Sequence, residues 1–236
     1  MNSSSIYIAL DFPNWAEANH FLQNNRLEGV PVKVGMELFY REGPSVIERL
    51  KEKEHPVFLD LKLHDIPTTV RQAMKNLASL EVDLVNVHAL GGTKMIEAAK
   101  EGLLSGHSNP HTKLIAVTLL TSHDEQSINE ELRIEGSIAH NTVHYAQLAN
   151  KHGADGVVCS VHEAKPIKES CGINFLTVTP GIRLAHSNSN DQKRIATPAC
   201  AKKNGSDYLV IGRSITQAKE PLNAYKQAIK EWEHGE

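Results

Sequence analysis

Cysteine is scarce in this chain, and basic residues are not in excess. The 236 residues include three cysteines, Cys159, Cys171 and Cys200, and no CxxC pair occurs among them. An odd number of widely spaced cysteines is typical of reduced thiols, so we expect neither a disulfide framework nor a zinc site. The formal net charge of -3 argues against a partner made of nucleic acid.

Long apolar runs are also missing. The sequence has no run of about 18 apolar residues, the length that a transmembrane helix needs. Residues 1–11, MNSSSIYIALD, lack a charged leading segment, and their apolar run is too short for a signal peptide. We therefore expect a cytoplasmic protein that does not bind a membrane.

What the chain has instead is a regular alternation of short β-rich runs and longer helical patterns. Strands are predicted at 5–11, 30–36, 56–63, 82–89, 112–120, 154–160, 174–182 and 206–215. Helices are predicted at 15–25, 43–53, 68–80, 93–103, 138–153, 162–170, 197–205 and 221–235, the sixth broken or delayed by Pro166. The stretch 124–136 is expected to be a polar excursion.

Eight strands that are apolar on both faces indicate a parallel sheet covered by helices, and the count of eight indicates an α/β fold of the TIM-barrel type. An open doubly wound sheet is the alternative, but no GxGxxG follows the first strand. No stretch resembles a linker. Residues 1–236 are therefore predicted to form a single (β/α)8 barrel domain.

Polar residues recur where the predicted strands end. In a (β/α)8 barrel, the carboxyl ends of the strands carry the functional site. The residues at these ends are Asp11, Lys33, Asp60, Lys62, His88, Thr121, Arg183, Gly212 and Arg213. The opposite strand ends show no comparable set, so we expect one site at the carboxyl end of the barrel.

Two of these charges lie in the stretch FLDLKLHDIPTTV, residues 58–70. Side chains alternate along a strand, so Asp60 and Lys62 share one face. They could form a structural ion pair, with Asp65 capping the next helix just ahead of Pro67. Their position at a strand end, with Lys33 ending the preceding strand, favours a catalytic cluster instead.

A phosphate site is predicted at the last two strand ends. Barrels commonly bind phosphate at the loops after strands seven and eight. Gly212 permits close approach of the backbone, and Arg213 can bind phosphate through two parallel hydrogen bonds. Arg183 and Gln192 lie on the preceding loop, where Gln192 could add a neutral donor.

The 13 histidines raise the question of a metal site. His140 and His144 have the i,i+4 spacing of two zinc ligands, but there is no HExxH motif and no evident third ligand. We expect both on the polar surface of a helix, and we expect no metal. His88 is expected to support the lysines through hydrogen bonds, and His64 is a weaker candidate for a base.

Several motifs, in this order, carry a family resemblance: PVKVGMELF, FLDLKLHDIPTTV, VNVHALGG, TPGIR, DQKR and YLVIGRSI. Together they resemble the bacterial orotidine 5'-phosphate decarboxylases, over residues 11–215. The resemblance implies a small nucleotide substrate, orotidine 5'-phosphate, that loses CO2 to give UMP in the last step of pyrimidine synthesis. It also implies that the reaction needs no cofactor.

The resemblance implies roles for individual residues. Lys33, Asp60, Lys62 and Asp65 would form a charged network in which Lys62 donates the proton. Asp11 would contact the nucleoside and Thr121 the pyrimidine, and the phosphate would be held by Arg183, Gln192, Gly212 and Arg213. Asp65, Ile66 and Thr69 would reach into the neighbouring subunit of a homodimer. Two departures concern loop closure: Ser214 stands where the family often has proline, and the loop 184–191 is rich in serine and asparagine.

Three other functions can be weighed against this one. Hexulose-phosphate synthases and keto-gulonate-phosphate decarboxylases share DxKxxD and use a magnesium-bound enediolate, but Lys33 and HDIPTTV favour the nucleotide enzyme. A Schiff-base aldolase needs a neutral lysine, whereas flanking aspartates favour the charged form. A barrel that only senses a phosphate ligand would not need the complete set of lysines and aspartates.

Overall fold

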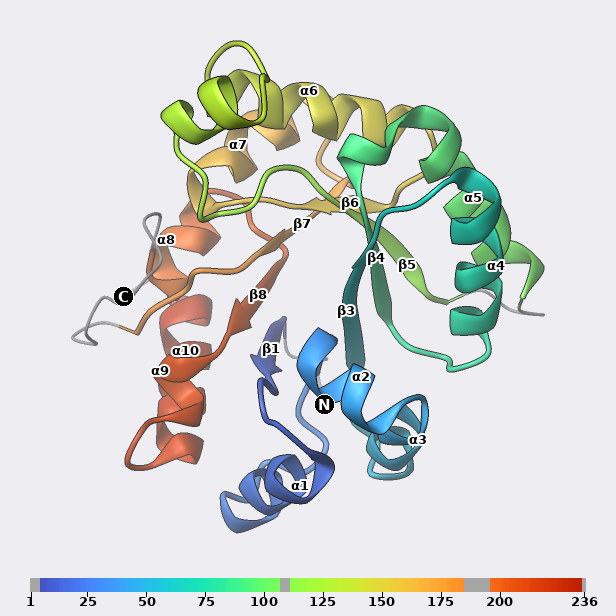
Figure 1. The fold of residues 1–236 in the computed structure, drawn as a ribbon. Coiled ribbons are helices and arrows are strands. Elements are labelled where there is room, and N and C mark those ends of the chain that lie inside the picture. Colours follow the sequence, from blue (N-terminus) through green and yellow to red (C-terminus); the bar gives the residue numbers. More distant parts are fainter. Residues whose placement is uncertain (1–4, 107–110, 185–195, 235–236) are drawn as a thin grey trace.

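A closed barrel of eight parallel strands forms the centre of the molecule in the computed structural model, which describes residues 5–106, 111–184 and 196–234 (Figure 1). The strands are β1 (Ile6–Ala9), β2 (Val32–Gly35), β3 (Val57–Leu63), β4 (Leu84–His88), β5 (Lys113–Val117), β6 (Gly156–Val158), β7 (Leu176–Thr179) and β8 (Tyr208–Ile211). Each strand pairs with the next, and β1 pairs with β8 to close the ring. The predicted TIM barrel is confirmed.

Helices surround the strands on the outside of the barrel (Figure 1). They are α1 (Trp15–Asn24), α2 (Met36–Glu42), α3 (Ser45–Glu52), α4 (Pro67–Ala78), α5 (Gly92–Ser105), α6 (Ile138–Lys151), α7 (Val161–Cys171), α8 (Pro198–Lys203), α9 (Arg213–Thr216) and α10 (Pro221–His234). Short turns η1 (Ala89–Gly91) and η2 (Ser127–Glu131) complete the elements. In the described part of the chain, no helix is both long and apolar enough to cross a membrane.

The strands bury side chains on both faces, as their composition predicted. Outward-facing residues such as Ile8 and Leu59 pack with the helices in the main core. A second cluster fills the barrel interior with Tyr7, Ala9, Phe58, Leu84, Ile115, Val178 and Val210. Because side chains alternate along β3, Asp60 follows Phe58 on the interior face and stands above this apolar cluster.

Helix α7 continues through Pro166, so the predicted break is wrong. Proline removes one amide donor from the helix. The helix is held instead at its start by the side chain of Glu163, which accepts a hydrogen bond from the backbone N–H of Ser160 at 2.7 Å, and further along by buried Ile167 and Lys168. Two short helices, α2 and α9, were not predicted, and the polar excursion contains the π-helical turn η2, which buries Ile128.

The amino ends of the strands carry a polar set of their own, which contradicts the sequence-based expectation. Aspartates directly before β4, β6 and β8 each accept a hydrogen bond from a backbone amide of the neighbouring strand. The bonds are Val57 N to Asp83 (2.7 Å), Leu114 N to Asp155 (2.8 Å) and Thr177 N to Asp207 (2.7 Å). These carboxylates join adjacent strands at the end of the barrel opposite the predicted site.

Candidate active site

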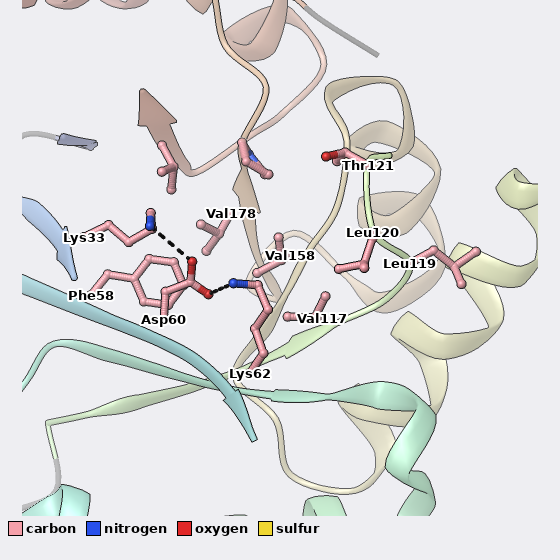
Figure 2. A pocket seen from close by; sticks show the side chains of 12 residues that line it. Lys33, Phe58, Asp60, Lys62, Val117, Leu119, Leu120, Thr121, Val158 and Val178 are labelled. Atoms are coloured by element: carbon pink, nitrogen blue, oxygen red, sulfur yellow. Dashed lines mark hydrogen bonds and ion pairs between the residues drawn. The ribbon is translucent and has the colours of Figure 1, made fainter. Parts of the chain in front are cut away.

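A cavity of about 180 Å³ lies at the carboxyl ends of the strands, where the site was predicted (Figure 2). Its polar lining consists of Lys33, Asp60, Lys62 and Thr121. Its apolar lining consists of Phe58, Val117, Leu119, Leu120, Val158, Val178, Pro180 and Val210. The cavity is therefore an apolar chamber with its charges concentrated on the β2–β3 side, where electrostatic interactions are stronger than in open water.

The charges form a row of alternating sign. Lys33 Nζ lies 3.1 Å from Asp11 Oδ1 and 3.4 Å from Asp60 Oδ2. Lys62 Nζ lies 2.7 Å from the other oxygen of Asp60. Asp60 therefore stands between the two ammonium groups, which point toward it in Figure 2. The structure brings together Asp11, Lys33, Asp60 and Lys62 as the sequence predicted.

The row keeps Lys33 and Asp60 charged despite their burial. Burial alone would lower the pKa of Lys33, but the carboxylates of Asp60 and Asp11 outweigh it, so that the pKa is raised. Burial alone would raise the pKa of Asp60, but Lys33, Lys62 and hydrogen bonds from Lys62 and Asn86 outweigh it, so that the pKa is lowered. At neutral pH, the pair is therefore an ammonium and a carboxylate fixed in an apolar chamber.

The end of β3 has an irregular backbone. The register between β3 and β4 shifts between Leu59 and Leu63, and Lys62 has a φ of 52°, in the left-handed region that non-glycine residues rarely adopt. The backbone N–H of Lys62 donates to Oδ1 of Asn86 at 2.7 Å, and Nδ2 of Asn86 donates to Asp60 Oδ1 at 2.7 Å. Sequence reasoning missed Asn86, although an asparagine in the apolar run VDLVNVHA was a visible signal.

The prediction that His88 supports the lysines through hydrogen bonds is wrong. In the described part of the chain, no hydrogen bond joins His88 to either lysine; its Nδ1 is buried without a partner, and its ring centroid lies 5.6 Å from that of His64. Burial, then nearby His64 and Lys62, lower the pKa of His88. The expected support fails because the ring packs against His64. His140 and His144 are exposed on α6, as predicted.

The residues predicted to act across a dimer, Asp65, Ile66 and Thr69, are exposed on the surface of the chain. Asp65 is exposed, and its Oδ1 accepts a hydrogen bond from the backbone N–H of Ile66 at 2.6 Å. Helix α4 begins at Pro67 with Ile66 at its N-cap position, so Asp65 does not cap the helix. Thr69 is exposed on the first turn of α4. Within one chain, Asp65 thus stands apart from the charged row.

The predicted phosphate ligands lie outside the cavity lining. Gly212 is the N-cap residue of α9 and Arg213 its first residue, and both are half-buried. A Cβ at Gly212 would stand 3.6 Å from Cβ of Ala9 and 4.0 Å from Oδ2 of Asp11, so this turn adjoins the charged row. Arg183 is buried, and its Nη1 donates to the carbonyl of Ile182. Gln192 lies outside the described residues.

Comparison with known proteins gives one consistent result. Residues 4–228 match the family described as Orotidine 5'-phosphate decarboxylase / HUMPS family. The orotidine 5'-phosphate decarboxylase of Bacillus pumilus is 57% identical over 96% of this chain and 97% of its own length. That of Bacillus cytotoxicus is 53% identical over 98% of both chains. A crystal structure of orotidine 5'-phosphate decarboxylase from Lactobacillus acidophilus is 42% identical, covering 96% of this chain and 98% of that one with a TM-score of 0.86.

Proposed function

Because the chain belongs to the orotidine 5'-phosphate decarboxylase / HUMPS family, we propose that its decarboxylation of orotidine 5'-phosphate takes place in the chamber beside Lys62. The chain is a carboxy-lyase of pyrimidine synthesis that releases UMP and CO2. The magnesium-dependent sugar-phosphate alternative gains no support from these relatives, which are all named as the nucleotide enzyme. The observation that carries the mechanism is the ammonium of Lys62 beside a carboxylate at the wall of an apolar cavity.

The chemistry explains why a fixed charge is needed. When the bond between C6 and the carboxylate breaks, the electron pair stays on C6 in the plane of the pyrimidine. The ring cannot delocalise that pair, so stabilisation has to come from nearby charge. Preorganised charge in a water-poor site is usually the largest single contribution to catalysis. Lys62 can stabilise the carbanion and then give it a proton, and the resulting amine recovers a proton from solvent.

Asp60 and Lys33 hold the ammonium group of Lys62 in place before the substrate binds. Asp60 contacts both ammonium groups through separate oxygens, at 2.7 and 3.4 Å. Lys33 is in turn held by Asp11, whose side chain is 64% exposed toward the open end. A row of opposite charges that is fixed before the substrate arrives does not have to reorganise during the reaction. We assign Asp60 and Lys33 to holding Lys62 in place in this way.

The row also indicates how the nucleotide lies. Asp11 stands between Lys33 and the Gly212 turn, so a nucleoside contacting Asp11 would bring its phosphate to Gly212 and Arg213. Its pyrimidine would then enter the chamber toward Lys62, where Thr121 offers a hydroxyl to the ring edge. We also assign Arg183 and Gln192 to the phosphate end, because phosphate sites of barrels form at these loops.

A homodimer would complete the site. A second cavity, of about 350 Å³, continues from Lys62 along Leu61, Leu63, Asp65 and Thr69. Its rim exposes Met36 (45%) and Tyr40 (70%), and Ile66 nearby is 66% exposed; large apolar side chains gathered in this way mark interaction surfaces. We assign this face to a second copy of the chain, in the cytoplasm, with Asp65, Ile66 and Thr69 of each copy completing the other's site.

The activity is tested by the loss of substrate absorbance when the protein is mixed with orotidine 5'-phosphate in the presence of a chelator. We expect turnover to continue with the chelator and to disappear in Lys62→Ala. Turnover that stops when magnesium is removed would favour the sugar-phosphate branch of the family instead.

The shared site has its own test, which mixes two inactive variants. In a mixed dimer of Lys62→Ala and Asp65→Asn chains, one site carries both changes, and the other site has both native residues. Random exchange should then restore about a quarter of native activity, since half the dimers are mixed and each has one intact site. Mixtures that stay inactive after confirmed exchange would exclude the contribution of Asp65 across the interface.

A further inference from the structure

We propose that Asn86 is a positioning residue for the decarboxylation, because one buried amide holds the backbone of Lys62 in its left-handed conformation and also holds the carboxylate that Lys62 contacts. This inference rests on the proposed role of Lys62. Asn86 itself lies within β4, outside the cavity lining, and it hydrogen-bonds to two residues that line the cavity, Lys62 and Asp60.

The first contact is to the backbone. In a regular parallel ladder, the N–H of Lys62 would pair with a carbonyl of the next strand. Here the register shifts, φ of Lys62 is 52°, and the N–H donates to the side-chain oxygen of Asn86 at 2.7 Å. The amide thus takes the place of a ladder partner at the irregular residue. Strained backbone of this kind persists when its surroundings hold it, and it concentrates at functional sites.

The second contact is to the carboxylate. Nδ2 of Asn86 and Nζ of Lys62 both donate to Oδ1 of Asp60, each at 2.7 Å. A backbone N–H can only donate and a carboxylate can only accept, so the amide has one orientation that satisfies both neighbours. Asn86 is 1% exposed, so solvent does not replace either bond. The result is a closed ring of hydrogen bonds that runs from the backbone N–H of Lys62 through Asn86 and Asp60 to the ammonium group of Lys62.

The ring explains why an amide is needed at this position. Leucine has a similar size but would make neither bond. Aspartate, when ionised, would face Asp60 with a like charge, whereas protonated aspartate could donate to Asp60 and still accept from Lys62. Since a misplacement of about 1 Å can cost roughly 100-fold in rate, loss of the ring should lower kcat more than it weakens binding.

The test begins with Asn86→Leu and a matched control. Thr112→Val also removes one buried hydrogen bond, from Thr112 Oγ1 to the carbonyl of Val82, but at the amino end of the barrel. We expect Asn86→Leu to lower kcat about 100-fold, with KM for orotidine 5'-phosphate changed by less than about threefold. Thr112→Val should keep kcat within about threefold. An Asn86→Leu enzyme with native kcat would overturn the proposal.

The pH profile of Asn86→Asp supplies a signature that a merely structural role would not produce. Burial and the like charge of Asp60 raise the pKa of a carboxyl placed at position 86. The ammonium groups of Lys62 and Lys33 act in the opposite direction, but both are already paired with Asp60. Below that pKa the protonated group replaces the amide, and above it two carboxylates repel each other. The kcat of Asn86→Asp relative to the native enzyme should therefore rise at least about tenfold as the pH falls from about 8 to about 5.5.

A relative kcat that is low and independent of pH would overturn the proposal. This test does not depend on the folding of Asn86→Leu, because the pH profile compares Asn86→Asp with the native enzyme. Lys62→Ala, assayed alongside, separates the two hypotheses. If Lys62→Ala keeps its turnover, the proposed function of Lys62 is wrong. If Lys62→Ala is inactive while the Asn86 variants keep native kcat, only the role of Asn86 is wrong.

Discussion

Two lysine–aspartate pairs lie at opposite ends of the barrel and differ in how fully the ammonium group is bonded. At the amino end, Lys168 donates to the carboxylate of Asp207 at 2.6 Å and to the carbonyls of Ile173 and Phe175, both at 2.8 Å. All three of its N–H donors are then used. At the carboxyl end, Asp60 is the single acceptor that the described residues provide for the ammonium of Lys62.

The difference separates a structural pair from the pair that we propose to be catalytic. The side chain of Lys168 is 7% exposed, and Asp207 also accepts from the backbone of Thr177, so this pair ties α7, β7 and β8 together. The side chain of Lys62 is 27% exposed and lines the cavity. An ammonium with unused donors at an apolar cavity can still bind or protonate a ligand, which Lys168 cannot do.

The largest effect on rate should come from Lys62→Ala. Removing the group to which we assign the stabilisation and protonation of the carbanion should lower kcat at least about 1000-fold, since even one hydrogen-bond donor at a developing charge is worth roughly 100- to 1000-fold. Because Asp60 keeps Lys33 and Asn86 as partners in this variant, Tm should change by less than about 3 °C, or about 1 kcal/mol. Single-turnover kinetics and thermal unfolding check both values. A large fall in Tm would show that the two pairs are alike.

The opposite result is expected for Lys168→Met. This change leaves the carboxylate of Asp207 and two carbonyls without their charged partner, and breaking a buried pair costs about 3–5 kcal/mol. For a chain of this size, Tm should fall by roughly 10 °C or more. The kcat of the folded fraction at low temperature should stay within about threefold of native, since Lys168 lies at the far end of the barrel. A large loss of kcat in folded Lys168→Met would contradict the assignment of Lys168 to stability and of Lys62 to catalysis.

Strand β8 allows the two ends of the barrel to be compared on one strand. Asp207, of the structural pair, precedes it, and Arg213, the proposed phosphate ligand, follows it. Arg213→Ala should lower kcat/KM for orotidine 5'-phosphate by about 100-fold, because binding energy from the distant phosphate also organises the site. The slow reaction of the nucleoside without phosphate should change by less than about threefold. Equal losses with both substrates would exclude the phosphate role of Arg213.

The sequence predicted the barrel and the charged row for physical reasons that are local. Alternation of side chains along β3 put Asp60 and Lys62 on one face, and the pairing of β2 with β3 brought Lys33 to them. The amino-end aspartates were missed because the predicted strands 82–89, 154–160 and 206–215 began too early. They absorbed Asp83, Asp155 and Asp207, which lie just outside the true strands and bond to their neighbours.

Other features depend on contacts that no local pattern encodes. The left-handed backbone at Lys62 and the register shift become visible only when β3 is paired with β4, and only then does Asn86 acquire a role. The packing of His88 against His64 likewise depends on how two strand ends meet. Helix α2 begins immediately after β2, without the polar turn that usually announces a helix in a sequence.

The smallest expected effect is a dependence of stability on pH that belongs to the carboxyl end. The lysines and the Asn86 amide lower the pKa of Asp60 despite burial. Such a carboxyl stabilises the folded chain above its unfolded pKa of about 3.9 and loses this contribution as the pH falls through the folded pKa. In denaturant unfolding, the advantage of the native enzyme over Asp60→Asn should therefore be constant from about pH 7 to pH 5 and shrink below about pH 4. The advantage over Thr112→Val, which removes no titratable group, should stay constant across that range. An advantage over Asp60→Asn that does not change in acid would mean that Asp60 is not held as a carboxylate by its lysines, and the contrast with the amino end would then lose its electrostatic basis.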